Sequence, residues 1–274
     1  MTEVTFNHII KDIYKHKDSI EVIVLYHGGE PLLNKKFTWM VQVIRKHFGN
    51  KLLIKTVTNG MLLNEAAAEK LVRSGLDSIE ISLDGLNPGQ NDLIRRGCRY
   101  NTVVNNIKKL IKIKNVNNST KPEIYIASTQ FYDPSKHKNT DEPAVPKYLL
   151  NEFSGDYKSE ISGYKCTWAM KWPRMIVSSD LYEIYSETLN VKSNFCDHVE
   201  NTITIRSNGD VVPCCYDLTS EYVVGSIMDS SLANIWNNER YLELRKSIKE
   251  GNFYNMCSNC AEVTDVNYLV LKQV

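Results

Sequence analysis

The stretch Val22-Ile23-Val24-Leu25-Tyr26-His27-Gly28-Gly29-Glu30-Pro31 joins a run of apolar residues to a polar turn that contains two glycines. A short, continuous apolar run predicts a strand that is buried on both faces, which is the usual setting of a parallel sheet. Ligands of such sheets bind beyond the carboxyl ends of the strands. Gly28 and Gly29 follow the run closely, and glycine lets a backbone approach a ligand. The stretch therefore predicts a parallel sheet with a ligand site at the end of this strand.

Helical and strand periods alternate on both sides of this stretch. Apolar residues that recur at helical spacing predict helices, and short apolar runs between them predict further strands. Elements that alternate in this way form right-handed parallel βα units, so the predicted fold class is α/β with a parallel sheet. The predicted helices span residues 6–14, 37–48, 64–75 and 103–111, and the predicted strands span residues 22–26, 52–57, 76–83 and 124–129.

Polar clusters follow three of the predicted strands. Asparagine, glycine and proline end strands in many proteins, so any one cluster alone is compatible with an ordinary turn. Three clusters at consecutive strand ends favour a shared ligand pocket, because the carboxyl ends of parallel strands meet at one edge of the sheet. The clusters are His27-Gly28-Gly29-Glu30-Pro31, Thr58-Asn59-Gly60 and Ser82-Leu83-Asp84-Gly85.

Four of the seven cysteines are spaced as the ligands of a metal centre. Cys196 and Cys214 stand apart, whereas Cys257 and Cys260 form a C-x2-C knuckle. Two separated halves, one of them a knuckle, allow a chain to surround one centre with four thiolates. Ligation by sulfur alone selects either an iron–sulfur cluster or tetrahedral zinc, and the residue pattern leaves both open.

The other three cysteines are not expected to bind the metal. Cys215 adjoins Cys214, and adjacent residues in an extended chain point to opposite sides, so we expect one of the two to face the metal and favour Cys214. Cys98 and Cys166 stand alone, and isolated cysteines usually behave as small hydrophobic residues.

Charge and hydropathy exclude several classes of partner. A formal net charge of +1 provides no electrostatic basis for binding nucleic acid or an anionic membrane. No segment approaches the ~20 apolar residues of a membrane span, and residues 1–18 lack the apolar core of a signal peptide. We therefore expect no nucleic-acid partner, no membrane partner and a cytoplasmic location, where thiols stay reduced.

The three strand-end clusters resemble those of the radical S-adenosylmethionine (radical SAM) enzymes. In that family a GGEP-type segment binds the amino group of S-adenosylmethionine, and polar residues at other strand ends hold its ribose and carboxylate. The resemblance implies a partial parallel (β/α) barrel of radical SAM type, and it assigns no catalytic residue. The cofactor-binding residues that it implies are Gly28, Gly29, Glu30, Pro31, Thr58, Asn59, Ser82 and Asp84.

The second half resembles the SPASM/twitch extension of such enzymes, which carries an auxiliary [4Fe-4S] cluster. The resemblance rests on Cys196-x12-Gly209-x4-Cys214 followed by the knuckle, with Asn208-Gly209 between apolar runs as a hairpin signal. No cysteine follows the knuckle, which fits the shorter twitch form. We expect residues 1–180 to form the partial barrel and residues 181–274 to form a small SPASM/twitch domain with a hairpin and helices. The ligands that the resemblance implies are Cys196, Cys214, Cys257 and Cys260.

The chain departs from the family pattern at one place. Radical SAM enzymes carry a C-x3-C-x2-C segment on the loop after their first strand, and residues 1–97 contain no cysteine. We expect the first strand and its cluster loop to be absent. The chain is then either a fragment of a longer enzyme, which we favour, or a degenerate relative that has lost the chemistry. In both cases the polypeptide as written is expected to be inactive in cleaving S-adenosylmethionine.

The resemblance implies an oxidoreductase or maturase that abstracts hydrogen from its substrate through a 5′-deoxyadenosyl radical. Its cofactors would be S-adenosylmethionine and the auxiliary cluster, and its partners a small-molecule or peptide substrate and an external electron donor. An alternative from another class is a zinc-stabilised, non-catalytic α/β binding protein. Metal content separates the two hypotheses.

Overall fold

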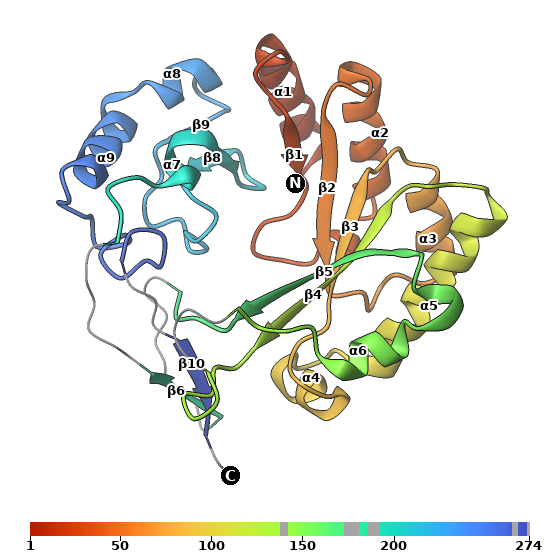
Figure 1. Cartoon of the computed structure of the whole chain (residues 1–274). Helices are drawn as coiled ribbons and strands as arrows, with labels where there is room; N and C mark the ends of the chain where they lie inside the picture. The colour runs from red at the N-terminus through yellow and green to blue at the C-terminus, as the bar shows by residue number, and fades with distance from the viewer. Residues whose placement is uncertain (138–141, 173–180, 186–191, 265–267, 273–274) are drawn as a thin grey trace. The chain divides into compact units, whose positions relative to one another are not determined.

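The computed structural model describes residues 1–137, 142–172, 181–185, 192–264 and 268–272, which form two compact units (Figure 1). We call Lys17–Gln130 with His137–Trp168 the sheet unit, and Met1–His16 with Phe131–Lys136 and the described part of Ala169–Val274 the cysteine unit. The boundary that the sequence predicts, at residue 180, falls at the end of residues 173–180, which lie outside the described residues. That boundary stays a prediction.

A five-stranded sheet in the order β1-β2-β3-β4-β5 forms the centre of the sheet unit, and every neighbouring pair of its strands is parallel. Figure 1 shows helices α2, α3 and α5 along one face of this sheet. The α/β class with a parallel sheet is therefore confirmed. The strands are β1 (Val22–Val24), β2 (Leu53–Thr58), β3 (Ser78–Ser82), β4 (Glu123–Gln130) and β5 (Ile161–Trp168), and the helices are α2 (Phe37–Phe48), α3 (Glu65–Val72), α4 (Pro88–Ile94), α5 (Tyr100–Val116), α6 (Lys147–Glu152) and the 3-10 helices η2 (Pro31–Leu33) and η3 (Gly155–Tyr157).

The core of the sheet unit follows from the alternation of side chains along the strands. Successive residues of a strand point to opposite faces, and in β2, β3 and β4 isoleucines with no measurable exposure recur on one face. Burial of each such side chain stabilises the fold by about 2 kcal/mol. Those isoleucines are Ile54, Ile79, Ile81, Ile124 and Ile126.

Two strands differ from what the sequence predicts. The strand at residues 22–26 is predicted to be buried on both faces, but β1 is the end strand of the order, and Val22 and Val24 are 40% and 47% exposed. That prediction is wrong because an apolar run does not say whether a strand lies inside a sheet or at its edge. β5 has no counterpart among the predicted strands, because residues 161–168 form neither an apolar run nor a strict alternation.

The cysteine unit contains short helices and antiparallel strands. Strands β7 (Thr204–Ile205), β8 (Asp210–Val212) and β9 (Gly225–Ser226) form one antiparallel sheet, and β6 (Tyr182–Tyr185) pairs with β10 (Tyr268–Leu271) in another. The β7–β8 connection is the predicted hairpin, and its Gly209 has a φ of 99°, which favours glycine. The helices are α1 (Glu3–Ile13), η1 (Tyr14–His16), α7 (Asp197–Asn201), α8 (Leu232–Trp236) and α9 (Glu239–Lys249).

A buried carboxylate joins the first helix of the chain to α8. Asp12, near the end of α1, is 5% exposed, and its Oδ2 accepts a hydrogen bond of 2.5 Å from the backbone N–H of Leu232. Leu232 is the first residue of α8, and the N–H groups at the start of a helix lack partners within it. Asp12 also pairs with Lys15 at 2.6 Å. One carboxylate therefore fixes two elements of the cysteine unit that lie 220 residues apart in sequence.

Across the described part of the chain, we find no helix with the length and apolar character needed to cross a membrane.

Candidate cofactor pocket and metal centre

The ends of β1 and β2 are joined by one carboxylate, Glu30. Its Oε1 accepts hydrogen bonds from the Thr58 hydroxyl at 2.6 Å and from the Leu32 backbone N–H at 3.0 Å, and its Oε2 accepts one from the Asn59 N–H at 2.7 Å. The bond to Leu32 caps the 3-10 helix η2, which begins at Pro31. The side chain of Glu30 therefore ties the first polar cluster to the second. Both of its oxygens are used by protein donors.

The end of β3 is held in the same way by Asp84, which is 5% exposed. Its Oδ2 lies 2.7 Å from Nε of Arg95, and its Oδ1 accepts a hydrogen bond of 2.8 Å from the backbone N–H of Thr129, next to the end of β4. The Asp84 N–H in turn donates to Oδ1 of the fully buried Asn91 at 3.0 Å. A charged pair with hydrogen bonds to both carboxylate oxygens keeps this loop in one conformation.

The remaining predicted cofactor residues divide into open and buried positions. Gly28 and Gly29 are exposed, and a Cβ built on Gly29 would meet nothing within 4 Å. Thr58 and Ser82 are buried, whereas Asn59 is half-buried. Backbone groups of the two glycines are thus accessible to a ligand, while Thr58 and Ser82 lie beneath the surface.

Cys98 lies in the connection between α4 and α5 and is half-buried. Burial raises the pKa of its thiol, the Arg95 cation lowers it, and the charges of Glu30 and Asp84 raise it further. Because β1, β2 and β3 are neighbouring parallel strands, the three predicted clusters follow strand ends at one edge of the sheet. Sequence reasoning gave Cys98 no role, because a lone cysteine has no spacing to interpret.

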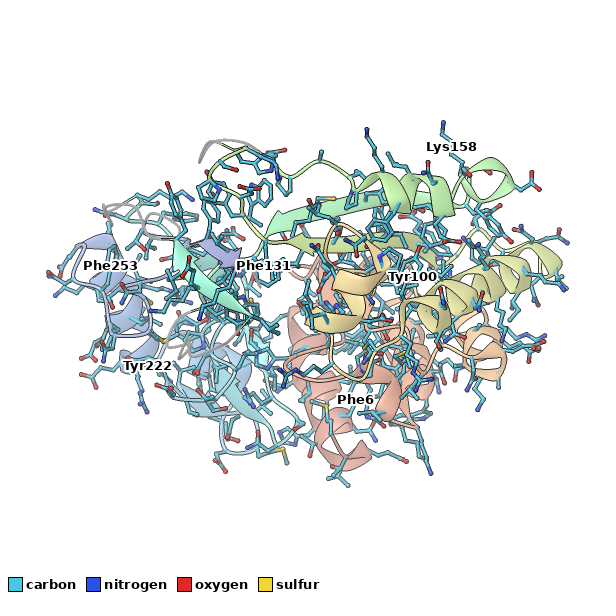
Figure 2. The ribbon with its side chains drawn as sticks, turned by 90° about the horizontal axis from the view of Figure 1, so that it is seen from below. Phe6, Tyr100, Phe131, Lys158, Tyr222 and Phe253 are labelled. Carbon is cyan, nitrogen blue, oxygen red and sulfur yellow. The ribbon has the colours of Figure 1, made fainter. Side chains whose placement is uncertain are left out.

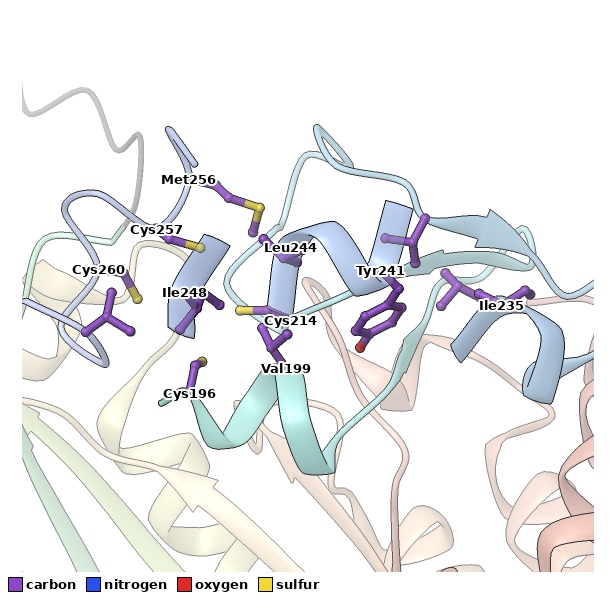
Figure 3. Close-up of a cluster of buried hydrophobic side chains, with 13 residues drawn as sticks. Cys196, Val199, Cys214, Ile235, Tyr241, Leu244, Ile248, Met256, Cys257 and Cys260 are labelled. Carbon is purple, nitrogen blue, oxygen red and sulfur yellow. The ribbon is translucent and has the colours of Figure 1, made fainter. Parts of the chain in front are cut away.

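The four cysteines that the spacing selects all lie in one buried core, which we call the cysteine core. They come from the residue before α7, from the segment after β8 and from the knuckle, and each is 6–7% exposed. Figure 3 shows them at one end of the core, with Tyr241 and Ile235 at the other. Tyr222 and Phe253, labelled in Figure 2, pack against it. Its members are Cys196, Val199, Val211, Cys214, Val224, Ile235, Tyr241, Leu244, Ile248, Met256, Cys257, Cys260 and Val263.

Burial keeps these sulfurs as neutral thiols unless a cation compensates. It raises the pKa of Cys257 to about 12 and that of Cys260 to about 11, and the charge of Cys196 adds to both shifts. For Cys214 a hydrogen bond with Cys215 raises the pKa most, and burial follows. The thiols affect one another because they are close in space. Metal ligation requires thiolates, so binding at this centre would release protons.

Backbone N–H groups already point at several of these sulfurs. The N–H of Tyr216 donates to Sγ of Cys214 at 3.2 Å, and backbone hydrogen bonds from His198 and Val199 lower the pKa of Cys196 against the effect of burial. Hydrogen bonds to sulfur are a standard feature of iron–sulfur sites. Four buried thiols with such donors fit an iron–sulfur cluster by the chemistry of the donor set.

The other cysteines lie outside the cysteine core. Cys215 is half-buried, with its sulfur 3.9 Å from Nδ1 of His198, and Cys98 and Cys166 are half-buried in the sheet unit. Within the described ranges, no three histidine, cysteine or carboxylate side chains converge closely enough to hold a single metal ion. The assignment of Cys196, Cys214, Cys257 and Cys260 as ligands stays a prediction.

Family models match both halves of the chain. Residues 1–125 match the model of the radical SAM superfamily, and residues 196–261 match the model of the SPASM iron–sulfur cluster-binding domain. Residues 1–125 are therefore similar to the radical SAM domain, and residues 196–261 are similar to the SPASM domain. These domains imply S-adenosylmethionine and [4Fe-4S] clusters as cofactors.

Individual proteins resemble the chain to different extents. The tungsten-containing aldehyde ferredoxin oxidoreductase cofactor-modifying protein of Pyrococcus furiosus is 26% identical over 274 aligned residues, which cover 88% of the chain and 74% of that protein. The GTP 3′,8-cyclase of Peptoclostridium acidaminophilum is 42% identical over 82 residues, which cover 30% of the chain and only 25% of that enzyme. The crystal structure of anSMEcpe with bound AdoMet and the Cp18Cys peptide has a TM-score of 0.64 at 16% identity, over 94% of the chain and 80% of that protein. This last likeness shows the fold alone.

Proposed function

We propose that the chain contributes to the reaction of a radical SAM oxidoreductase or maturase. The strand-end loops of the sheet unit would bind S-adenosylmethionine, and the cysteine core would hold an auxiliary [4Fe-4S] cluster. When bound and reduced by one electron, S-adenosylmethionine supplies a 5′-deoxyadenosyl radical that abstracts a hydrogen atom from the substrate. The radical SAM and SPASM family matches agree with this proposal.

The observation that carries the proposal is the burial of the four spaced cysteines in one core. They come from three segments separated by up to 42 intervening residues, between Cys214 and Cys257. Cysteines that are buried by chance can lie anywhere in the protein. These four share one core, and the charge of Cys196 raises the pKa values of Cys257 and Cys260. An auxiliary cluster accounts for all four positions together.

In the sheet unit, the proposed roles of the cofactor residues differ. Gly28, Gly29 and Pro31 would present backbone groups to the cofactor, because the glycines are exposed and glycine permits close approach. The Glu30 and Asp84 side chains would act indirectly, because their oxygens already accept protein hydrogen bonds. They would hold Thr58, Asn59 and Ser82 at the pocket.

The substrate would lie against the sheet face opposite the buried isoleucines. That face carries an ion pair between Lys165 of β5 and Glu80 of β3, and the Lys165 ammonium also lies 5.1 Å from the centre of the Tyr125 ring. Charged and aromatic side chains of this kind suit a polar small molecule or a peptide. The anSMEcpe structure contains a bound peptide, and the relative from Pyrococcus furiosus is named for modifying a cofactor. An external electron donor completes the proposed set of partners.

The sequence of residues 1–274 contains no C-x3-C-x2-C segment. We therefore propose that this polypeptide by itself binds S-adenosylmethionine without cleaving it.

The test is to measure iron, sulfide and zinc per chain after anaerobic reconstitution, together with S-adenosylmethionine binding by equilibrium dialysis. About four irons with matching sulfide, and one bound S-adenosylmethionine, are expected. A content of one zinc per chain without sulfide would mean that the four cysteines form a structural zinc site and hold no cluster. A chain that loads the cluster but binds no S-adenosylmethionine would contradict the proposed roles of the strand-end loops.

A further inference from the structure

Arg245, on α9, lies beside the cysteine core and has no role in the proposal above. Its side chain is only 13% exposed. The guanidinium carbon lies 4.1 Å from the centre of the Trp236 ring and 4.2 Å from that of Tyr241, so two aromatic faces surround the cation. Tyr241 is a fully buried member of the cysteine core. The charge of Arg245 is therefore held in a low-dielectric region beside that core.

The hydrogen bonds of Arg245 reach the helix that begins at Cys196. Its Nε donates to the backbone carbonyl of Val199 at 3.3 Å, and its Nη1 donates to the carbonyl of Trp236 at 2.7 Å. Val199 lies in α7, a helix of five residues for which Cys196 is the N-cap residue. Helices this short have little stability of their own. Arg245 thus fixes the orientation of α7, and with it the position of Cys196.

A second path leads from Arg245 to Cys214 through Tyr241. The Tyr241 hydroxyl lies 3.3 Å from the carbonyl oxygen of Thr202 and 3.4 Å from that of Pro213, the residue directly before Cys214. The Tyr241 ring therefore contacts the guanidinium, while its hydroxyl lies beside the residue before Cys214, so the cation is close to the segment that carries this proposed ligand.

One nitrogen of Arg245 is unused. Its Nη2 is buried, and no described residue accepts a hydrogen bond from it. A buried donor without an acceptor is unfavourable, and native proteins contain few of them. The carboxylate of Glu200, 3.7 Å from Nε, pairs with the guanidinium from a more exposed position. The structure therefore retains a buried cation whose hydrogen bonds within the protein are incomplete.

We propose that Arg245 is a positioning residue for the auxiliary cluster, which holds the Cys196 helix and raises the cluster's reduction potential through its fixed positive charge. The inference rests on the proposed ligand set of Cys196, Cys214, Cys257 and Cys260. One-electron reduction adds a negative charge to a cluster, and a nearby cation stabilises the reduced form. Removal of the cation is therefore expected to move the potential to more negative values.

The test compares reconstituted wild type with Arg245→Met, Arg245→Lys and Arg240→Met. Methionine preserves much of the packing between the two rings without the charge, whereas lysine keeps the charge without the paired carbonyl contacts. Arg240→Met is the matched control, because Arg240 is an exposed arginine of the same helix that lies 4.8 Å from the Tyr222 ring. Each protein is assayed for iron and sulfide, and its potential is measured by a redox titration followed by electron paramagnetic resonance.

We expect Arg245→Met to show a more negative potential than wild type, and Arg245→Lys to lie close to wild type. Both variants should lose iron to a chelator about ten-fold faster, as expected for loss of a residue that orients a metal ligand. Arg240→Met should match wild type in both measurements. A purely structural role would alter iron retention but not the reduction potential. The reduction potential of Arg245→Met therefore tests whether the charge of Arg245 acts on the cluster.

Two results would overturn the inference, and they are distinguishable. An Arg245→Met protein with full iron and an unchanged potential contradicts the role of Arg245 alone. A wild-type chain that takes up no iron and sulfide contradicts the ligand set as well. If Arg245→Met fails to fold, the rate of iron loss from Arg245→Lys tests the positioning role. Loss faster than in wild type supports that role, and slower or unchanged loss contradicts it.

Discussion

The two candidate sites satisfy their polar groups in opposite ways. At the strand ends of the sheet unit, the carboxylates of Glu30 and Asp84 accept hydrogen bonds from protein donors on both oxygens. In the cysteine core, four buried thiols have raised pKa values, mainly because of a hydrogen bond with Cys215 for Cys214 and because of burial for the others. We therefore expect the first site to be complete before any cofactor binds, and the second to be complete only with the proposed metal.

This difference predicts different dependence on the cofactors. Because the strand-end loops are held by their own hydrogen bonds, the sheet unit should fold without S-adenosylmethionine. The cysteine unit has short helices and short strands around the thiols, so its stability should depend on the cluster. Metal sites without a preformed ligand arrangement couple binding to folding. The following changes test or sharpen that contrast.

The largest effect is expected from Cys257→Ser, which should abolish uptake of iron and sulfide and unfold the C-terminal third of the chain. A hydroxyl is a poor replacement for a thiolate ligand, and the remaining three thiols would surround an incomplete site. Iron and sulfide assays with circular dichroism measure both consequences. Cys166→Ser, in β5 of the sheet unit, is the matched control and should keep the metal. A Cys257→Ser protein with its full metal content would refute the ligand assignment.

A smaller effect is expected from Asp84→Asn in the sheet unit. It removes the charge that pairs with Arg95 and weakens the bond from Thr129, which should lower the free energy of unfolding by about 2 kcal/mol. Urea denaturation of the reconstituted protein measures this value. Asp133→Asn, at an exposed ion pair with Lys136, should leave the midpoint unchanged. Equal midpoints for all three proteins would contradict the idea that Asp84 stabilises its loop.

Glu30→Gln should affect cofactor binding more than stability. Glutamine has one carbonyl oxygen, so it cannot accept the bonds from both Thr58 and Asn59 on separate oxygens. We expect S-adenosylmethionine to bind roughly ten-fold more weakly, equivalent to about 1.4 kcal/mol. Equilibrium dialysis measures the affinity, with Glu21→Gln, before β1, as the control. Unchanged affinity in Glu30→Gln would mean that the tie between the two loops does not shape the pocket.

The smallest effect concerns Asp12 and appears only in acid. Burial alone raises the pKa of this carboxyl. The hydrogen bonds from Lys15 and Leu232, together with the charges of Lys15 and His16, lower the pKa by more than burial raises it, so the net pKa is below the ordinary value. The ionised form therefore stabilises the folded state. This contribution is fully present above the unfolded pKa of about 4 and is lost as the pH falls through the lower folded pKa.

Asp12→Asn should consequently be less stable than wild type near neutral pH, and the difference should shrink below about pH 4. Chemical denaturation of the reconstituted protein at a series of pH values measures it. Asp18→Asn, at an exposed pair 3.9 Å from Lys51, is the control and should follow the wild-type pH profile. A pH-independent difference for Asp12→Asn would show that its charge contributes nothing to joining α1 and α8.

Sequence patterns predicted the positions that local rules determine. Asn64, the first residue of the predicted helix 64–75, caps α3 through its side chain, Gly209 turns the β7–β8 hairpin, and the apolar period of residues 37–48 gives α2 at the same bounds. Cysteine spacing likewise selected four residues that share one core. Such features depend on residues close in sequence, or on a motif with fixed spacing.

Features that depend on tertiary neighbours were not predictable. Nothing local distinguishes the edge position of β1 from an interior one, and the polar sequence of β5 becomes a strand only beside β4. The bond from Asp12 to Leu232 and the contacts of Arg245 join distant segments, so neither has a sequence signal. The same holds for the bonds of the Glu30 side chain to Thr58 and Asn59, which the GGEP segment does not indicate.

The most direct test of the contrast is amide hydrogen exchange, followed by mass spectrometry, before and after anaerobic reconstitution with iron and sulfide. The account predicts that peptides from residues 196–264 gain protection when the cluster loads, whereas peptides from β2, β3 and β4 keep the same protection throughout. Loading of iron and sulfide with no change in residues 196–264 would show that the cysteine unit is already complete without its metal, and would contradict the account.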